Sequence, residues 1–198
     1  MLEQYIVLDL ETTGLAKTKD KITEIAAVKV KNNKIIDKFQ TLVNPGRMIP
    51  AEAVQLTGIT NKMVQKEKLI QEILPKLVNF LEDYPIVAHN AEFDHGFLDY
   101  NSNKYLKQPI TNKKICTVKL ARKLFPKIVS CRLNSLCNYF NIDNKQAHRA
   151  MSDTLATTKL FLKFQAIMHN NGIQGENQIF DFFENPAAKL NLCTSSFI

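Results

Sequence analysis

The chain has 198 residues, 45% of them hydrophobic, and its 26 Lys and Arg against 19 Asp and Glu give a formal net charge of +7. No apolar stretch approaches the roughly 20 residues that cross a membrane, so we expect no membrane partner. The surplus of positive charge suits a nucleic-acid partner, and a lysine-rich composition without such a partner explains it equally well.

Apolar patterns predict three strands in the N-terminal part of the chain, at residues 6–10, 22–31 and 34–43. Asn32 and Asn33 separate the second strand from the third, and such a pair favours a tight hairpin turn. Pro and Gly residues between positions 45 and 58 then predict an irregular loop. The fold is therefore expected to open with an antiparallel meander.

Alternating helices and strands follow this meander. An apolar stripe over residues 69–81 predicts a helix, with Pro75 either in its first turn or as a kink. Further strands are expected at 86–88 and 114–116, and helices at about 118–125, 133–140 and 149–170, the last ending at Asn171-Gly172. The pattern predicts one α/β domain, residues 1–171, with helices flanking a mixed five-stranded sheet.

Residues 172–198 form a C-terminal extension that starts polar and becomes apolar around Phe182 and Phe183. Two phenylalanines in succession seldom face water, so we expect the extension to pack back on the domain. The alternative is a docking peptide for a sliding clamp or a polymerase subunit, because Gln178 followed by the two phenylalanines is faintly similar to clamp-binding peptides.

The four cysteines show no Cys-x-x-Cys spacing and no matched histidines, which argues against a zinc site. The N-terminus runs directly into a strand-like pattern without a secretory apolar segment. We therefore expect buried thiols in a cytoplasmic protein rather than disulfides. The cysteines are Cys116, Cys131, Cys137 and Cys193.

Asp9 and Glu11 interrupt the first apolar strand. Alternate strand residues point to the same side, so the two carboxylates would lie together, with their Cα atoms roughly 6.6 Å apart. Burying both without a cation costs on the order of several kcal/mol. Oxygen ligands select hard ions such as Mg²⁺ or Mn²⁺, so this strand end is a candidate metal platform; a solvated strand terminus is the alternative.

Two later segments offer further acids and a histidine. Asp94 lies in a helix-like pattern that follows the strand at 86–88. Asp153 opens the longest helical pattern, and His148 precedes it by five residues, which places the histidine in the loop before the helix. Four carboxylates suit two divalent metals about 3.5–4 Å apart, the arrangement that promotes phosphodiester hydrolysis. An imidazole is a suitable base near neutral pH.

In this order and spacing, Asp9-x-Glu11, Asp94 and His148-x-x-x-x-Asp153 resemble the three motifs of the DEDDh family of 3′–5′ exonucleases. The resemblance runs from about residue 5 to residue 164. Residues 22–28, 43–46 and 56–60 are most similar to the polymerase-associated branch of the family. That branch includes the exonuclease domain of the Gram-positive replicative polymerase and the proofreading epsilon subunit of bacterial DNA polymerase III.

The resemblance implies a ribonuclease H-like three-layer fold and a metal-dependent exonuclease that releases nucleoside 5′-monophosphates from a 3′ end. It implies that two divalent cations, Mg²⁺ or Mn²⁺, are held by Asp9, Glu11, Asp94 and Asp153, with His148 as the general base. It also implies a set of substrate contacts: Thr12, Leu15, Glu52, Thr57, Asn90 and Phe97, together with His148. Of these, Leu15 and Phe97 equally suit the apolar core.

The sequence leaves the natural substrate open. Single-stranded or mispaired DNA, processed in proofreading or repair, is favoured because the loop segments resemble the polymerase-associated branch. An enzyme that trims RNA 3′ ends is the alternative, since relatives with these motifs process either polymer. A nucleic-acid-binding module without turnover is the third possibility, and the complete set of acids argues against it.

Overall fold

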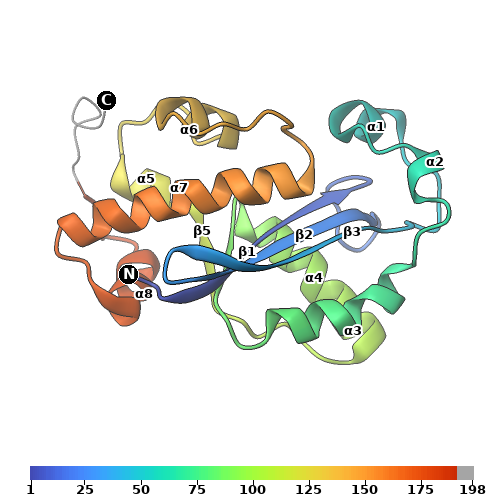
Figure 1. Ribbon diagram of the computed structural model, residues 1–198, viewed down its shortest axis with the longest axis horizontal. Helices are drawn as coiled ribbons and strands as arrows, with labels where there is room; N and C mark the ends of the chain where they lie inside the picture. The colour runs from blue at the N-terminus through green and yellow to red at the C-terminus, as the bar shows by residue number, and fades with distance from the viewer. Residues whose placement is uncertain (191–198) are drawn as a thin grey trace.

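The computed structural model describes residues 1–190, and a five-stranded mixed sheet forms the centre of this part of the chain (Figure 1). The strand order is β3-β2-β1-β4-β5, so β1 is central. β1 pairs antiparallel with β2 and parallel with β4, which in turn pairs parallel with β5. The strands are β1 Gln4–Thr12, β2 Ile22–Lys31, β3 Lys34–Leu42, β4 Ile86–Ala88 and β5 Lys114–Cys116. The predicted mixed sheet is confirmed.

The hairpin between β2 and β3 turns at Asn32 and Asn33, as predicted. Their φ angles are 49° and 63°, the left-handed values that a tight two-residue turn requires and that asparagine tolerates better than most residues. This turn sets the register in which Lys31 lies opposite Lys34.

Side chains of β1 alternate between two apolar layers. Tyr5 and Val7 are buried in a cluster with α7, whereas Ile6 and Leu8 are buried in a cluster with α3 and α4. Helix α7 and helix α3 accordingly lie on opposite faces of the sheet (Figure 1). The helices of the first layer are α5 Thr117–Leu124, α6 Leu133–Tyr139 and α7 Ala150–Asn170, and those of the second are α3 Ile70–Leu81 and α4 Ala91–Leu106. The period of two places Asp9 and Glu11 on the α7 side.

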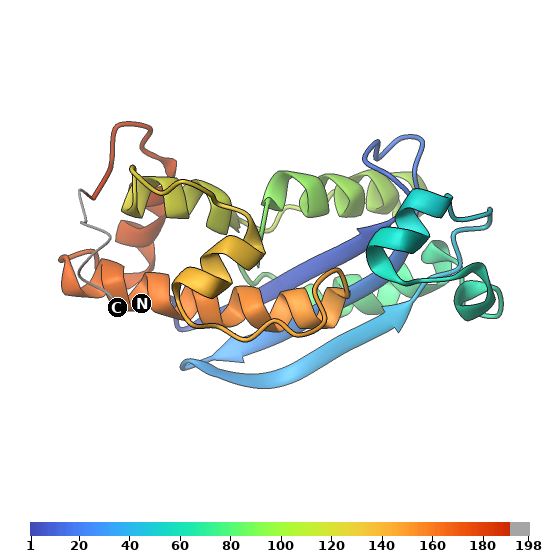
Figure 2. The ribbon, with the colours of Figure 1, turned by 90° about the horizontal axis from the view of Figure 1, so that it is seen from above.

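Of two short helices that were not expected, α1 Ala51–Thr57 lies in the segment predicted to be irregular, and α2 Asn61–Val64 follows this segment. Gly58, with a φ of 71°, ends α1, and a small apolar cluster that includes Ile59 and Val64 holds both helices together. They lie beyond the end of β1, beside the loop that follows this strand (Figure 2). Pro75 is the sixth residue of α3, beyond the first turn.

The C-terminal extension contains a helix, α8 Gly175–Glu184, that was not predicted. Phe180 and Phe182 are buried in the same apolar cluster as α7, and Phe183 is partly buried against it. Lys123 Nζ donates a hydrogen bond to the carbonyl oxygen of Phe182 at 3.1 Å. Expectations for the last segment, including Cys193, concern residues outside the described part. Within residues 1–190, no helix is long and apolar enough to span a bilayer.

Candidate active site

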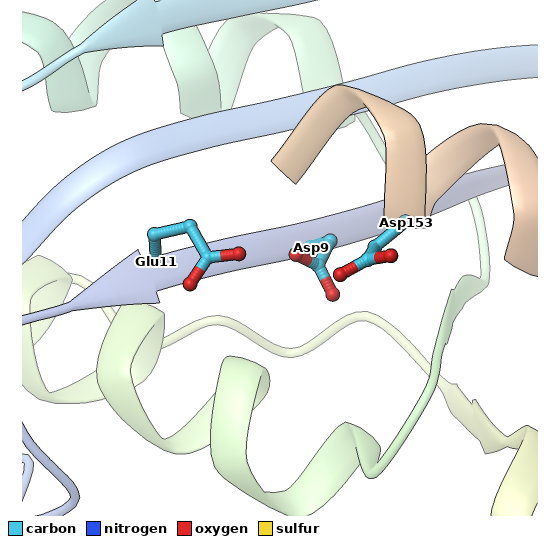
Figure 3. Close-up of side chains that lie close together, drawn as sticks. All are labelled: Asp9, Glu11 and Asp153. Carbon is cyan, nitrogen blue, oxygen red and sulfur yellow. The ribbon is translucent and has the colours of Figure 1, made fainter. Parts of the chain in front are cut away.

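Three carboxylates meet at the C-terminal end of β1. Asp9 and Glu11 come from alternate positions of the strand, and Asp153 comes from the first turn of α7 (Figure 3). One ligand oxygen from each of the three residues lies within 4.8 Å of the others. The contacts between α7 and β1 thus bring together residues 144 positions apart in the chain, at a spacing that suits a shared cation.

The surroundings of these acids oppose their ionisation. Glu11 is 8% exposed, and burial, followed by the charges of Asp153, Glu24 and Asp94, raises its pKa to about 8. Burial likewise raises the pKa of Asp9 well above its usual range, and Asp94, Glu11 and Asp153 add to the effect. A divalent cation would relieve this repulsion, and hard oxygen ligands match Mg²⁺ or Mn²⁺. The donor set therefore fits the expected metal.

Asp94 lies beside this trio without joining the three-oxygen group. It is in the first turn of α4, only 2% exposed, and its Oδ1 accepts a hydrogen bond from the backbone N–H of Leu10 at 3.1 Å. Burial raises its pKa despite this bond, and its charge is the strongest of those that raise the pKa of Asp9. All four predicted acids are thus neighbours, with Asp94 fixed to the backbone of β1.

His148 lies in the turn that precedes α7, as its spacing from Asp153 predicted. Its backbone has a φ of 65°, a left-handed conformation that is costly for a residue other than glycine. The backbone N–H of His148 donates to Asp153 Oδ2 at 3.0 Å, which ties this conformation to the acid cluster. The side chain is exposed and lines the cleft beside the acids.

This cleft has a volume of about 630 Å³ and lies between the end of β1, helix α1 and the start of α4. Its lining includes most of the predicted substrate contacts: Thr12, Leu15, Glu52, Thr57, Asn90 and His148. Leu15 and Leu56 present apolar side chains that are 85% and 57% exposed, and both line this cleft.

Phe97 departs from the prediction. It is 1% exposed and belongs to the core cluster of α3 and α4, so it does not line the cleft. Phe93, one helical turn earlier, lines the cleft and packs its ring against Phe97 at 4.9 Å between centroids. Both aromatic positions lie on α4, and only the packing of this helix decides which of them faces the cleft.

A partly buried ion pair beside the acids, between Glu24 and Arg149, was not recognised from the sequence. Glu24, 1% exposed, accepts hydrogen bonds from Arg149 Nε at 3.1 Å, from Arg149 Nη2 at 3.0 Å and from the backbone N–H of Ala150 at 3.0 Å. Burial acts to raise the pKa of Glu24, but these bonds and one from Gln40 outweigh it and lower the pKa. Two features of the sequence could have indicated this pair: Glu24 lies within an apolar predicted strand, and Arg149 directly follows His148.

A second hollow, of about 560 Å³, lies between α5, α8 and the first turn of α4. Five cationic side chains line it: Lys113, Lys114, Lys119, Arg122 and Lys123. Glu92 pairs with two of them and offsets one positive charge, because its carboxylate contacts Lys114 Nζ at 2.7 Å and Lys119 Nζ at 2.8 Å. Some of the scattered lysines of the sequence are therefore gathered on one surface.

Residues 6–161 match the protein-family model RNase_T, described as Exonuclease. The chain is 42% identical over 178 residues to "DNA polymerase III PolC-type" of Bacillus subtilis and covers 12% of that protein and 89% of its own length. It is 37% identical over 159 residues to "DNA polymerase III subunit epsilon" of Aquifex aeolicus and covers 79% of that protein and 80% of itself. It therefore spans only a small part of the PolC-type relatives.

Solved structures give the same assignment. A structure described as "Exonuclease X in complex with 5' overhanging duplex DNA" superimposes with a TM-score of 0.72 and 30% identity, covering 90% of this chain and 99% of that one. The nuclease domain of 3'hExo, described as a DEDDh family member, superimposes with a TM-score of 0.70 over 86% of this chain and 93% of that one, at 18% identity, which shows the fold alone. The chain belongs to the exonuclease family, and its fold is ribonuclease H-like.

Proposed function

We propose that this domain is a 3′–5′ exonuclease that releases nucleoside 5′-monophosphates from single-stranded or mispaired DNA ends. One observation carries the proposal: Asp9, Glu11 and Asp153 converge within 4.8 Å, and Glu11 also lines a cleft whose volume of about 630 Å³ suits a nucleotide. A structural role is unfavourable for three mutually repelling acids of which Glu11 and Asp153 are buried and Asp9 is partly buried, because none of the three neutralises another.

Asp9, Glu11 and Asp153, with Asp94 beside them, would hold two divalent cations, Mg²⁺ or Mn²⁺. When bound, such cations neutralise charge on the phosphate and lower the pKa of water. His148 stands next to the acids on an exposed segment of the cleft wall. We assign to its imidazole the removal of a proton from the attacking water.

The cleft lining supplies the substrate contacts of the proposal. The exposed apolar surfaces of Leu15 and Leu56 suit the face of a base, and Phe93 offers an aromatic ring for stacking. Thr57 is 6% exposed, and its hydroxyl donates to the carbonyl of Ala53 at 2.8 Å, so it holds the end of α1 in place as part of the cleft wall.

DNA is the proposed substrate because the relatives with more than 30% identity include PolC-type polymerases and an epsilon subunit. Trimming of RNA 3′ ends is the alternative. We propose that the protein is cytoplasmic. Its proposed protein partner is a polymerase subunit. Docking to a sliding clamp through Phe182 would require α8 to leave the apolar cluster in which this side chain is buried.

The test is a time course with 5′-labelled single-stranded DNA, duplex DNA with a mispaired 3′ end, and RNA of the same sequence. With Mg²⁺ or Mn²⁺ we expect a ladder of shorter DNA products and release of nucleoside 5′-monophosphates, and no cleavage in excess chelator. Faster shortening of RNA would favour the alternative substrate. Cleavage of closed circular single-stranded DNA would contradict the requirement for a 3′ end.

His148→Ala is the matched variant for this assay. It removes the proposed base and leaves all four carboxylates, so the rate should fall by roughly 100-fold to 10,000-fold while stabilisation by Mn²⁺ in thermal unfolding persists. A variant with near wild-type rate would assign proton removal to another group and leave the metal ligands in place.

A further inference from the structure

Asn144 lies nine residues before Asp153, in the segment between α6 and α7, and its side-chain amide contacts the acid cluster directly. Its Nδ2 donates to Asp153 Oδ1 at 2.7 Å and contacts Asn134 Oδ1 at 3.2 Å. Its Oδ1 accepts a hydrogen bond from Ser152 Oγ at 2.7 Å. The side chain thus links α6, the segment before α7 and the first turn of α7 through three polar contacts.

We propose that Asn144 is a positioning residue that fixes the carboxylate of Asp153 for cation binding. The inference rests on the proposed function, in which Asp153 is a metal ligand. Asn144 is none of the four acids and is not the proposed base. Through Asn144, the segment between α6 and α7 would influence the affinity of the site for the cation.

The two oxygens of Asp153 are held by different groups. Oδ1 accepts from Asn144 Nδ2, and Oδ2 accepts from the backbone N–H of His148 at 3.0 Å. Asp9 and Glu11 repel this carboxylate, so an unrestrained side chain would rotate toward solvent before a cation arrives. Each carboxylate oxygen has two acceptor sites, so the bond from Asn144 leaves Oδ1 able to bind a cation as well.

The same carboxylate couples Asn144 to His148. The left-handed backbone of His148 is held by its N–H bond to Asp153 Oδ2, and this oxygen keeps its place only while the carboxylate does not rotate. Loss of the Asn144 contact is therefore expected to weaken cation binding and to loosen the segment that presents the proposed base. Partners that orient a ligand carboxylate typically change metal affinity by 10-fold to 100-fold.

The test measures Mn²⁺ binding by isothermal titration calorimetry, without substrate, for wild type and four variants of the full chain. Asn144→Ala removes the contact, and Asn144→Leu removes it while keeping the branching and the number of heavy atoms of the side chain. Asn134→Ala is the matched control, because it removes a partner of Asn144 and leaves the bond to Asp153. Ser152→Ala deletes the other partner. Thermal unfolding with and without Mn²⁺ separates cation affinity from general stability.

We expect the Kd for Mn²⁺ to rise about 10-fold to 100-fold in both Asn144 variants and by less than about threefold in Asn134→Ala. Ser152→Ala should lie between them. In the exonuclease assay, the metal concentration for half-maximal rate should shift by the same factor, and excess metal should restore most of kcat. A lower melting temperature with unchanged Kd in the Asn144 variants would overturn the proposal and leave a purely structural role.

The outcomes separate this inference from the proposed function. If wild type binds Mn²⁺ but shortens no nucleic acid, the proposed activity is wrong and the Kd values still decide the role of Asn144. If wild type binds no Mn²⁺, the metal site and the role of Asn144 are both wrong. If Asn144→Ala binds Mn²⁺ normally and wild type is an active nuclease, only the role of Asn144 is wrong.

Discussion

Glu11 and Glu24 lie directly opposite each other in the ladder between β1 and β2, and their surroundings shift the pKa values of the two carboxyl groups in opposite directions. Glu24 is surrounded by the guanidinium of Arg149, the N–H of Ala150 and the amide of Gln40, which lower its pKa. Burial of Glu11, together with the charges of Asp153, Glu24 and Asp94, raises its pKa to about 8. The two buried glutamates of this strand pair therefore differ in their contacts: Glu24 forms an ion pair with Arg149, whereas Glu11 lies among other acids.

The difference separates a structural acid from a functional one. The bonds of Glu24 join β2 to the start of α7 and so fix the end of the helix that carries Asp153. The charge of Arg149 offsets only part of the effect on Glu11, whose pKa stays raised, and the acid cluster of Glu11 remains available for an external cation. A protein that keeps an unfavourable group at a cleft gives up stability there in exchange for binding.

The largest effect is expected from Glu11→Gln. The amide keeps the shape of the side chain and removes the negative charge, so exonuclease activity with Mg²⁺ should fall by at least about 1000-fold. Binding of single-stranded DNA should persist, because phosphate contacts by Lys and Arg are separate from the acids. Parallel measurement of product ladders and of fluorescence anisotropy checks both parts. Retention of more than a tenth of the wild-type rate would exclude Glu11 as an essential ligand.

The free energy of unfolding of the metal-free protein should decrease as pH rises. Ionisation of Glu11 accounts for part of this decrease. A carboxyl whose pKa is raised from 4.5 to about 8 by folding keeps a proton that the unfolded chain has lost. The stability contributed by that proton is present below pH about 4.5 and is lost as pH rises through about 8, by on the order of a few kcal/mol.

Urea unfolding in chelator at pH 6 and pH 9 measures this loss. Glu11→Gln should show a smaller decrease than wild type, and added Mg²⁺ at pH 9 should restore wild-type stability more than that of the variant. Equal pH dependence in the two proteins would show that Glu11 is not the group that titrates.

The sequence predicted the elements that carry the site more completely than those that surround it. The bounds of β2 and the turn at Asn32 and Asn33 follow from local signals, an apolar run and two residues that tolerate left-handed backbone. The pairing of Asp9 with Glu11 follows from the period of a strand. Helices α1 and α2 were missed because seven- and four-residue helices are too short to show a helical period.

The remaining misses depend on tertiary packing. Phe93 and Phe97 are four residues apart on α4, and the sequence does not show which ring faces the cleft and which the core. Asn144 and Asp153 meet only because the preceding segment folds back on α7. The partner of Glu24 lies 125 residues away, and no pattern within β2 indicates it. Residues whose role is to hold other residues are recognised only once their partners are placed.

The smallest effect, and the one that most directly tests the contrast, is expected from Glu24→Gln. The amide oxygen still accepts from the N–H of Ala150, but the ion pair with Arg149 is lost, so the free energy of unfolding should fall by about 1–3 kcal/mol. Exonuclease activity at saturating Mg²⁺ should fall by about tenfold at most, because the start of α7 shifts without loss of a ligand.

Gln40→Ala is the control: it removes only a peripheral hydrogen bond of 3.2 Å to Glu24 and should lower the free energy of unfolding by less than about 1 kcal/mol. Urea unfolding at pH 7 and initial rates on single-stranded DNA give the two numbers for each variant. If Glu24→Gln lost as much activity as Glu11→Gln at unchanged stability, Glu24 would belong with the functional acids, and the distinction between the two glutamates would be wrong.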